Sequence, residues 1–281
     1  MTPYRRVVIT GIGAVSPLGN TIRENWENLL AGKSGIGALT RFDATGFRCR
    51  IGGEVKNLNA DELLGPKEAK RLDLFCHFAA AAADEAVRQA GLDGGDHGVN
   101  PERIAVMVSS GIGGLNTLSQ QIQILQNKGP GRVSPLTVPM MISDMAAGYL
   151  AIRYQFQGPN FGLVSACASG LHSIGEAFWM IRRKDADIVL AGGTEASITP
   201  IGQAGFSSMH ALSERNDDPT QASRPFDRDR DGFVPAEGAG ILVLEEAEQA
   251  EKRGATALAE VVGYGLSGDA FHITAPHSEG L

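Results

Sequence analysis

Short runs of β-branched and aliphatic residues alternate with longer segments of helical periodicity, and this alternation constrains the fold more than any other feature of the sequence. The runs at 7–10, 103–109 and 186–193 are composed like buried strands, and apolar residues recur at helical spacing over 68–90 and 171–183. Strands separated by helices predict an α/β fold with a substantially parallel sheet.

The remaining segments complete this pattern. A Thr-x-x-Glu capping box at 21–24 predicts the start of a helix whose apolar face holds Trp26, Leu29 and Leu30. The glycines of 11–13 are expected to end the first strand in a turn. Further helices are predicted at 143–156 and 246–253, and further strands at 160–165, in two short pieces within 232–246, and from 258 onward.

The bulk composition excludes several classes of function. The formal net charge is −7, opposite in sign to the basic field of a nucleic-acid-binding protein. The three cysteines are too few and too widely spaced for a disulfide framework or a zinc site. The sequence has no signal-peptide pattern and no apolar stretch of about 18 residues. We therefore expect a cytoplasmic protein that neither binds nucleic acid nor inserts into a membrane.

One cysteine lies where a predicted strand passes directly into a predicted helix. Cys167 is the central residue of VSACASG, so small residues flank it on both sides. The positive end of a helix that begins there favours the thiolate, and its free N–H groups can hold an oxyanion during acyl transfer. A lone cysteine is otherwise more often a small buried apolar residue, and we favour that interpretation for Cys49 and Cys76. From geometry alone, both interpretations of Cys167 stay open.

Several motifs in fixed order resemble those of one protein family. They are RVVITGIGAVSPLG at 6–19, SGIGGL at 110–115, SACASG at 165–170, AGGTE at 191–195, and SRPFD with RDGFV at 223–227 and 230–234. Taken alone, the last stretch is a charged turn that enters a hairpin, with Arg and Asp pairs that fix a loop. Together the motifs are similar in order and spacing, along all 281 residues, to the β-ketoacyl-(acyl carrier protein) synthases, in particular the type II synthases of fatty-acid elongation.

This resemblance implies a fold and a reaction. The family has the thiolase fold, in which two similar halves stack in five layers, αβαβα. Residues 1–253 correspond to a complete N-terminal half that carries the nucleophile, and 254–281 to the beginning of a truncated C-terminal half. The implied reaction is the decarboxylating condensation of an acyl thioester with malonyl-acyl carrier protein, through an acyl-enzyme on cysteine. The implied reaction uses no metal or redox cofactor. Its substrates are carried on the phosphopantetheine of acyl carrier protein.

The resemblance also assigns roles to individual residues. Cys167 is implied to be the nucleophile and, through its backbone N–H, one oxyanion donor. Phe233 corresponds to a phenylalanine beside the nucleophile that assists decarboxylation, although a plain core aromatic is an equally good interpretation. Ile112 and Phe206 correspond to positions that line the acyl pocket. Thr274 corresponds to a threonine that hydrogen-bonds the phosphopantetheine arm.

The implied partner is an acidic carrier protein, so its docking surface is expected to be basic. The resemblance assigns this role to Lys67, Lys70, Arg71 and Arg132. A solvated helix face accounts for the first three equally well. A further basic contact of the family falls on His210, which is only partly charged at neutral pH. The family also implies a homodimer, in which the strand before the nucleophile pairs across the two-fold axis.

The sequence departs from the family at its end. Two catalytic histidines, a lysine and a second oxyanion donor of the family correspond to positions beyond 281. None of the six histidines has the sequence context of those two, and the resemblance does not make His272 the base. We therefore expect a fragment whose cysteine can be alkylated but which does not catalyse condensation by itself.

Four alternatives stay open at this point. The chain could belong to a polyketide ketosynthase or to a degradative thiolase, although SACASG and RDGFV favour the carrier-dependent synthases. It could also be a non-catalytic partner that resembles a chain-length factor, against which the retained Cys167 argues. The last alternative is a remnant that only dimerises or binds the carrier protein.

Overall fold

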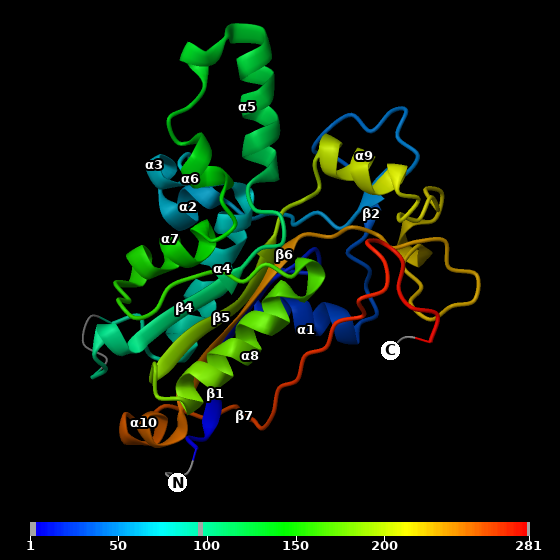
Figure 1. The fold of residues 1–281 in the computed structure, drawn as a ribbon. Helices are drawn as coiled ribbons and strands as arrows, with labels where there is room; N and C mark the ends of the chain where they lie inside the picture. The colour runs from blue at the N-terminus through cyan, green and yellow to red at the C-terminus, as the bar shows by residue number, and fades with distance from the viewer. Residues whose placement is uncertain (1–3, 95–97, 280–281) are drawn as a thin grey trace.

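The computed structural model describes residues 4–94 and 98–279, and these residues form a five-stranded sheet packed between helices (Figure 1). The strand order is β4-β5-β6-β1-β7. The bounds are Ile104–Ser109 for β4, Ile188–Glu195 for β5, Gly238–Glu246 for β6, Val7–Val15 for β1 and Ala259–Val261 for β7. The predicted α/β class is confirmed.

The sheet is mixed, so the prediction of a substantially parallel sheet was wrong. β4 pairs with β5 in parallel, whereas β6 is antiparallel to both of its neighbours, β5 and β1, and β7 is antiparallel to β1. The reason is that β6 follows the long connection over residues 196–237 and inserts between β5 and β1, both of which run in the opposite direction. The helical periodicity of the sequence could not reveal this insertion.

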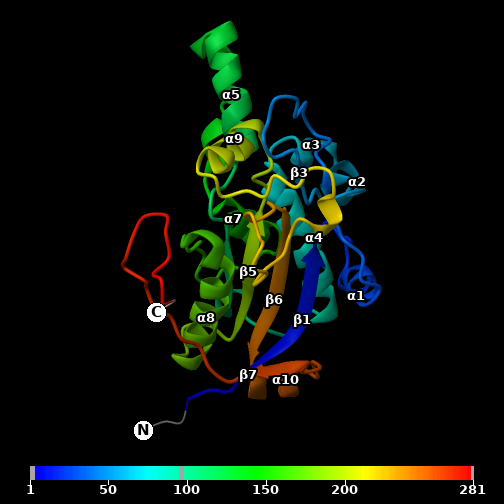
Figure 2. The same cartoon turned by 90° about the vertical axis from the view of Figure 1, so that its right-hand side faces the viewer.

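Helices cover both faces of the sheet and make a three-layer α-β-α arrangement (Figure 2). On β4, Ile104, Val106 and Val108 belong to the core cluster with helices α4 (Leu74–Gln89) and α7 (Met145–Tyr154). The alternate residues Ala105 and Met107 belong to a second cluster with α8 (Ser169–Arg182). Successive side chains of a strand point to opposite faces, so the sheet lies between α8 and the pair α4 and α7.

The glycines of the first motif lie inside β1 and do not end it, contrary to the predicted turn. A Cβ on Gly11 would lie 2.1 Å from the carbonyl oxygen of Ala86, and one on Gly13 would lie 1.8 Å from that of Ala82. Helix α4 therefore approaches the strand so closely that only glycine fits. The role of these glycines is close packing between helix and sheet.

Three other local predictions differ from the structure. Residues 160–165 form only a single bridge, from Asn160 to Val106, because the next available N–H, that of Leu163, donates to the Ser109 side chain. The predicted helix at 68–90 is divided into α3 (Pro66–Ala69) and α4. The predicted pair of strands within 232–246 is the single strand β6.

The first helix, α1 (Ile22–Leu30), begins at the predicted cap, where Thr21 accepts a hydrogen bond from the N–H of Glu24. Its predicted apolar face is exposed, however, with Trp26 60%, Leu29 58% and Leu30 71% accessible. The helix is held instead by buried Asn25, whose side-chain amide donates to the carbonyls of Gly19 and Thr21. The apolar face is therefore not a core contact among the described residues.

The remaining elements are short or project from the sheet. Helix α5 (Leu115–Lys128) extends away from it and returns through α6 (Thr137–Met141), as Figure 1 shows. The others are α2 (Ala60–Leu64), α9 (Pro200–Ser208), α10 (Ala247–Lys252), β2 (Gly37–Ala38) and β3 (Ile51–Gly52). In the part of the chain that the structure describes, no helix is long and apolar enough to cross a membrane.

Candidate functional site

The candidate nucleophile stands on a strained turn at the entrance to α8. A single 3-10 turn, Ala166–Ala168, leads directly into the helix, and Cys167 is its central residue. Ala166 has a φ of +51°, a left-handed conformation that costs a residue with a Cβ roughly 1–2 kcal/mol. Cys167 is exposed, whereas Cys49 and Cys76 are buried, so the structural interpretation of the latter two is confirmed. The turn presents Cys167 to solvent at the start of a helix, as the sequence predicts.

Side-chain hydrogen bonds hold this turn in place. Ser169 Oγ accepts from the N–H of Ser165 at 2.9 Å and donates to the carbonyl of Ala166 at 2.7 Å. Ser165 Oγ lies 2.7 Å from Nδ1 of His172, one turn further along α8. These contacts span both sides of Cys167, so the conformation of Ala166 is fixed from outside the turn.

Small residues allow the start of α8 to lie against the end of β5. A Cβ on Gly193 would come within 2.9 Å of the Cα of Gly170. Ser173 and Ser109 place their Oγ atoms 2.5 Å apart beneath this contact. Gly170 of SACASG and Gly193 of AGGTE therefore lack side chains for the same reason: the start of α8 packs directly against the backbone of β5.

A half-buried carboxylate lies beneath a loop next to the nucleophile turn. Glu195, at the end of β5, accepts hydrogen bonds through Oε2 from the N–H groups of Gly111 and Ile112, at 3.0 and 3.2 Å. Ser110 Oγ donates to Oε1 at 3.1 Å. Burial raises the pKa of Glu195 above its ordinary value, against the opposing effect of these hydrogen bonds. A Cβ on Gly111 would be 3.3 Å from the Ala166 carbonyl, so the loop touches the nucleophile turn.

Sequence reasoning did not identify Glu195 as a site residue. The available signal was its place as the final residue of AGGTE, at the predicted end of a buried strand. An acidic residue at such a position needs donors, and the glycine-rich loop after the neighbouring strand supplies them.

Phe206, predicted to line the acyl pocket, packs against Phe233, predicted to lie beside the nucleophile. The rings of Phe206 and Phe233 meet edge to face, with centroids 5.4 Å apart and an interplanar angle of 79°. Phe206 packs on the small cluster of Cys49, Ile51 and Leu212. Phe233 is 46% exposed, so it is not a plain core aromatic in the described part of the chain. Ile112, the other predicted residue of the acyl pocket, is 43% exposed on the loop above Glu195.

Thr274 lies in the segment that follows β7, which passes along α8 before it diverges (Figure 1). In that segment Tyr264 covers Gly175 of the helix, where a Cβ would be 2.1 Å from the ring. Thr274 is exposed, and its N–H donates to Nδ1 of His272 at 3.1 Å. The contacts of both residues are local to their loop, and the predicted role of Thr274 stays a prediction. The last two residues of the predicted C-terminal segment, 280 and 281, lie outside the described residues.

The predicted docking residues are all exposed. Lys67 lies on α3, and Lys70 and Arg71 follow it directly. Arg71 Nη1 is 3.1 Å from Glu68 Oε1. Arg132 ends the short 3-10 helix Pro130–Arg132.

His210 contacts an arginine side chain, and its predicted docking role stays a prediction. Its Nδ1 lies 3.0 Å from Nη1 of Arg48. A guanidinium can only donate, so Nδ1 is the acceptor in this contact. Arg48 is a permanent cation at this place on the surface, and its Nε is also 2.9 Å from Glu214.

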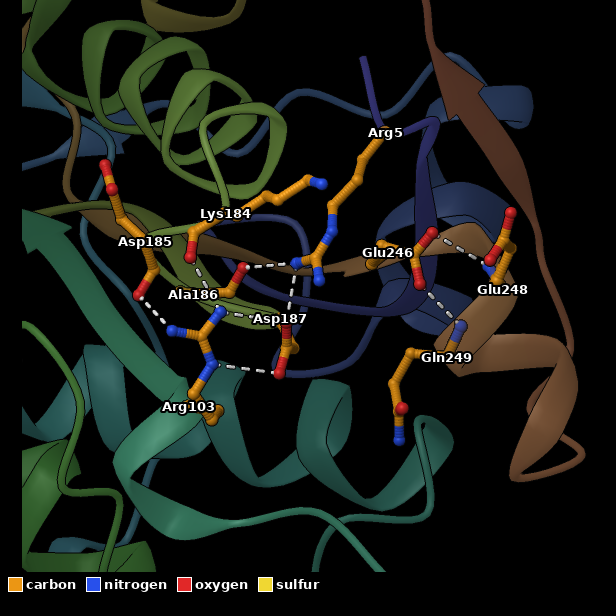
Figure 3. Close-up of polar contacts among 9 residues, drawn as sticks. All are labelled: Arg5, Arg103, Lys184, Asp185, Ala186, Asp187, Glu246, Glu248 and Gln249. Atoms are coloured by element: carbon orange, nitrogen blue, oxygen red, sulfur yellow. Dashed lines mark hydrogen bonds and ion pairs between the residues drawn. The ribbon is translucent and has the colours of Figure 1, made fainter. Parts of the chain in front are cut away.

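A hollow of about 550 Å³ lies at the end of the sheet opposite the nucleophile turn. Its lining includes Arg5, Arg6, Lys184 and Glu246. Figure 3 shows that Arg5 and Arg103 both point toward Asp187 beside it, at 2.6 and 3.0 Å. Arg103 and Asp187 directly precede β4 and β5, whereas Ser110 and Glu195 stand at the other ends of these parallel strands. The ion pairs of Asp187 with Arg5 and Arg103 therefore connect the starts of β1, β4 and β5, at the end of the sheet remote from Cys167.

Comparison with known proteins agrees with this geometry. Residues 4–250 match the family model of the β-ketoacyl synthase N-terminal domain. The chain is 52% identical over 276 residues to 3-oxoacyl-[acyl-carrier-protein] synthase 2 of Synechocystis, and 51% identical over 280 residues to that of Staphylococcus aureus. These alignments cover 98% and 100% of this chain, and 66% and 67% of the relatives, so the chain spans about two thirds of their length.

Solved structures show the same likeness. A β-ketoacyl synthase from Burkholderia phymatum superposes with a TM-score of 0.88 at 31% identity, covering 98% of this chain and 67% of that one. A ketosynthase of a type II PKS, solved with its acyl-carrier protein, gives 0.84 at 32% identity, covering 96% and 65%. These matches agree with the exposed cysteine turn and with the three-layer α-β-α arrangement. The chain therefore belongs to the β-ketoacyl synthase family and has its thiolase-like fold.

Proposed function

We propose that this chain supplies the acyl-accepting site of a 3-oxoacyl-[acyl-carrier-protein] synthase of fatty-acid elongation. The single observation that carries the proposal is the exposed Cys167 on its strained turn at the start of α8. Other cysteines of the chain are buried and have no comparable setting. The relatives named 3-oxoacyl-[acyl-carrier-protein] synthase 2 support the same assignment.

The first step transfers an acyl group to the cysteine. The Cys167 thiolate attacks the thioester carbonyl of acyl-carrier protein, and N–H groups of the first helical turn, that of Cys167 among them, hold the oxyanion. Collapse of the tetrahedral intermediate expels the phosphopantetheine thiolate, which takes up a proton. The acyl chain then extends along the apolar side chains of Ile112 and Phe206.

The second step forms the carbon–carbon bond in the whole enzyme. Malonyl-carrier protein loses CO₂, and the resulting carbanion attacks the Cys167 thioester, with return of the thiolate. The product is 3-oxoacyl-carrier protein, two carbons longer than the acyl donor. Phe233, edge-on to Phe206, offers the malonyl carboxylate an apolar setting that favours its loss. Neither step needs a metal or a redox cofactor.

The proposed partners are acyl carrier protein and a second copy of the chain, with the reaction in the cytoplasm. The exposed cations Lys67, Lys70, Arg71 and Arg132 suit an acidic carrier protein, and Thr274 is assigned to its phosphopantetheine arm. For the homodimer, the support is exposed apolar side chains. Phe161 and Val164, in the segment that bridges to β4, are 40% and 62% accessible, and Leu171, at the start of α8, is 70% accessible.

A polyketide ketosynthase is the second candidate, because the likeness includes a type II PKS ketosynthase and the ishigamide ketosynthase/chain length factor, the latter at 33% identity and a TM-score of 0.86. The identity to the fatty-acid synthases is higher, at 52% and 51%. The retained Cys167 argues against a purely chain-length-factor role. Transfer of the acyl group to cysteine is common to both candidates.

The test is transfer of a radiolabelled acyl group from acyl-carrier protein to the purified chain. We expect label on the wild type, no label on Cys167→Ala, and full label on Cys76→Ala, a matched change at a buried cysteine. Circular dichroism establishes that all three are folded. A folded wild type that takes no label, or a Cys167→Ala variant that retains it, contradicts the proposal.

A further inference from the structure

The carboxylate of Glu195 makes its hydrogen bonds to one loop and to its own strand end. Through Oε2 it accepts from Gly111 and Ile112, and through Oε1 from Ser110 Oγ and from the N–H of Ala196, at 3.3 Å. The residue is half-buried, and burial raises its pKa. A half-buried carboxyl with four donors around it fixes the groups that donate, because loss of the acceptor would leave the part-buried donors of Ser110 and Gly111 unpaired.

The loop of 110–114 is held from its other side as well. Ser110 Oγ, which donates to Glu195, accepts from the N–H of Gly113 at 2.8 Å. The N–H of Gly114 donates to the carbonyl of Met141, at the end of α6, at 3.0 Å. A Cβ on Gly113 would be 2.5 Å from that same carbonyl. The loop is thus wedged between Glu195 and α6, and it touches the carbonyl of Ala166 next to the nucleophile.

Ile112 has no comparable support from its own side chain. It is 43% exposed and belongs to none of the three buried clusters of the described residues. Its position is set by its backbone, whose N–H donates directly to Glu195. This hydrogen bond therefore ties the backbone of Ile112 to the end of β5.

We propose that Glu195 is a positioning residue that sets chain-length selectivity, by holding Ile112 as a wall beside the group attached to Cys167. The proposal deepens the proposed function and rests on it for its biological meaning. A two-carbon group is too short to need this wall, whereas an eight-carbon group lies along it. Loss of Glu195 should therefore slow attachment of long groups and spare short ones.

The experiment uses thiol reagents, so it does not depend on acyl transfer. Ethyl and octyl methanethiosulfonate each convert the cysteine thiolate to a mixed disulfide and release methanesulfinate. The rates at Cys167 are measured by intact-protein mass spectrometry in the wild type, Glu195→Ala and Glu195→Gln. We expect Glu195→Ala to lower the octyl-to-ethyl rate ratio about tenfold. Glu195→Gln should keep the ratio within about threefold, because its carbonyl still accepts from Gly111 and Ile112.

Two further variants distinguish an effect on chain-length selectivity from a general loss of rigidity in the protein. Ile112→Ala should lower the ratio like Glu195→Ala, and the double variant should add little, since both changes remove the same wall. Asp84→Asn is the matched control, a partly buried carboxylate on α4 that pairs with Arg153, and it should leave the ratio unchanged. If Glu195→Ala does not fold, Ser110→Ala removes part of the same network and takes its place.

The proposal is overturned if Glu195→Ala leaves the ratio unchanged, or lowers both rates equally. It is also overturned if the effects of Glu195→Ala and Ile112→Ala on the ratio multiply. The same proteins are then incubated with two-carbon and eight-carbon acyl-carrier protein. A wild type that forms both disulfides but accepts neither acyl group refutes the proposed function and leaves the role of Glu195 decided by the reagents.

Discussion

A Cβ placed on Gly13 would stand 1.8 Å from the carbonyl oxygen of Ala82, so β1 and α4 are in contact through their backbones. Gly11 faces Ala86 in the same way, at 2.1 Å. The two glycines are two residues apart on a strand, and the two alanines are four apart on a helix, so each pair lies on one face of its element. The repeated contact sets the depth to which α4 sits on the sheet.

Substitution of Gly13 by alanine should therefore be severe. We expect Gly13→Ala to lower the free energy of unfolding by about 3 kcal/mol, the upper end for overpacked cores, because the clash is with backbone that cannot rotate away. Gly240→Ala on the adjacent strand is the control, since a Cβ there meets nothing within 4 Å. Urea denaturation measures both, and equal effects would contradict this account of the packing.

These glycines also show what the sequence could not predict. Read locally, Gly-Ile-Gly after a β-branched run indicates a turn, whereas the actual requirement comes from a helix some 70 positions later. The segment at 160–165 fails in a related way, because its strand-like composition says nothing of the Ser109 side chain that takes its N–H. Both errors arise where a partner distant in sequence decides the conformation.

The candidate nucleophile could be predicted because its setting is local. A cysteine among small residues, just before a segment of helical periodicity, predicts the tight turn and the helix that follows, although the strand predicted before it does not form. Glu195 could not be predicted in the same way. Its donors come from the loop after β4, and which loop lies beside which strand end is a property of the sheet order β4-β5.

The ion pair between Arg253 and Glu245 should be important for stability. Both guanidinium contacts to the carboxylate are 2.6 Å long, and the Glu245 side chain is fully buried. Arg253→Ala leaves that carboxylate buried without its cation, which should cost about 3–5 kcal/mol. Thermal unfolding measures the loss.

Arg183→Ala is the control. Its ion pair with Asp185 is half exposed, so this variant should change stability by less than about 1 kcal/mol. Similar losses in the two variants would be incompatible with this explanation.

Asp187 should make the protein more sensitive to acid. The hydrogen bonds and charges of Arg103 and Arg5 hold the pKa of Asp187 below its ordinary value, although burial opposes them (Figure 3). The folded state then binds fewer protons than the unfolded state between the two pKa values, so stability rises with pH in that window and is lost as pH falls through the folded pKa.

Asp187→Asn should remove this part of the acid dependence. Urea denaturation between about pH 3 and pH 6 brackets the ordinary pKa of an aspartate, and the difference between wild type and variant should shrink as the pH falls. Asp185→Asn, at an exposed neighbouring carboxylate, is the comparison. A wild-type advantage that stays constant over this range would rule out the proposed linkage.

The pair of Arg48 and His210 leads to a prediction about carrier-protein docking. Arg48 donates to Nδ1 of His210, so a permanent positive charge lies at this place on the surface. Arg48→Gln should weaken binding of acyl carrier protein roughly fivefold at low ionic strength, equivalent to about 1 kcal/mol for one exposed charge. The effect should fall as salt is added, because exposed charges are screened. His210→Gln, which leaves the permanent charge of Arg48 in place, should change the affinity by less than about twofold. Fluorescence anisotropy with labelled carrier protein at two salt concentrations measures both variants. A larger loss for His210→Gln than for Arg48→Gln would show that the histidine is the docking cation after all.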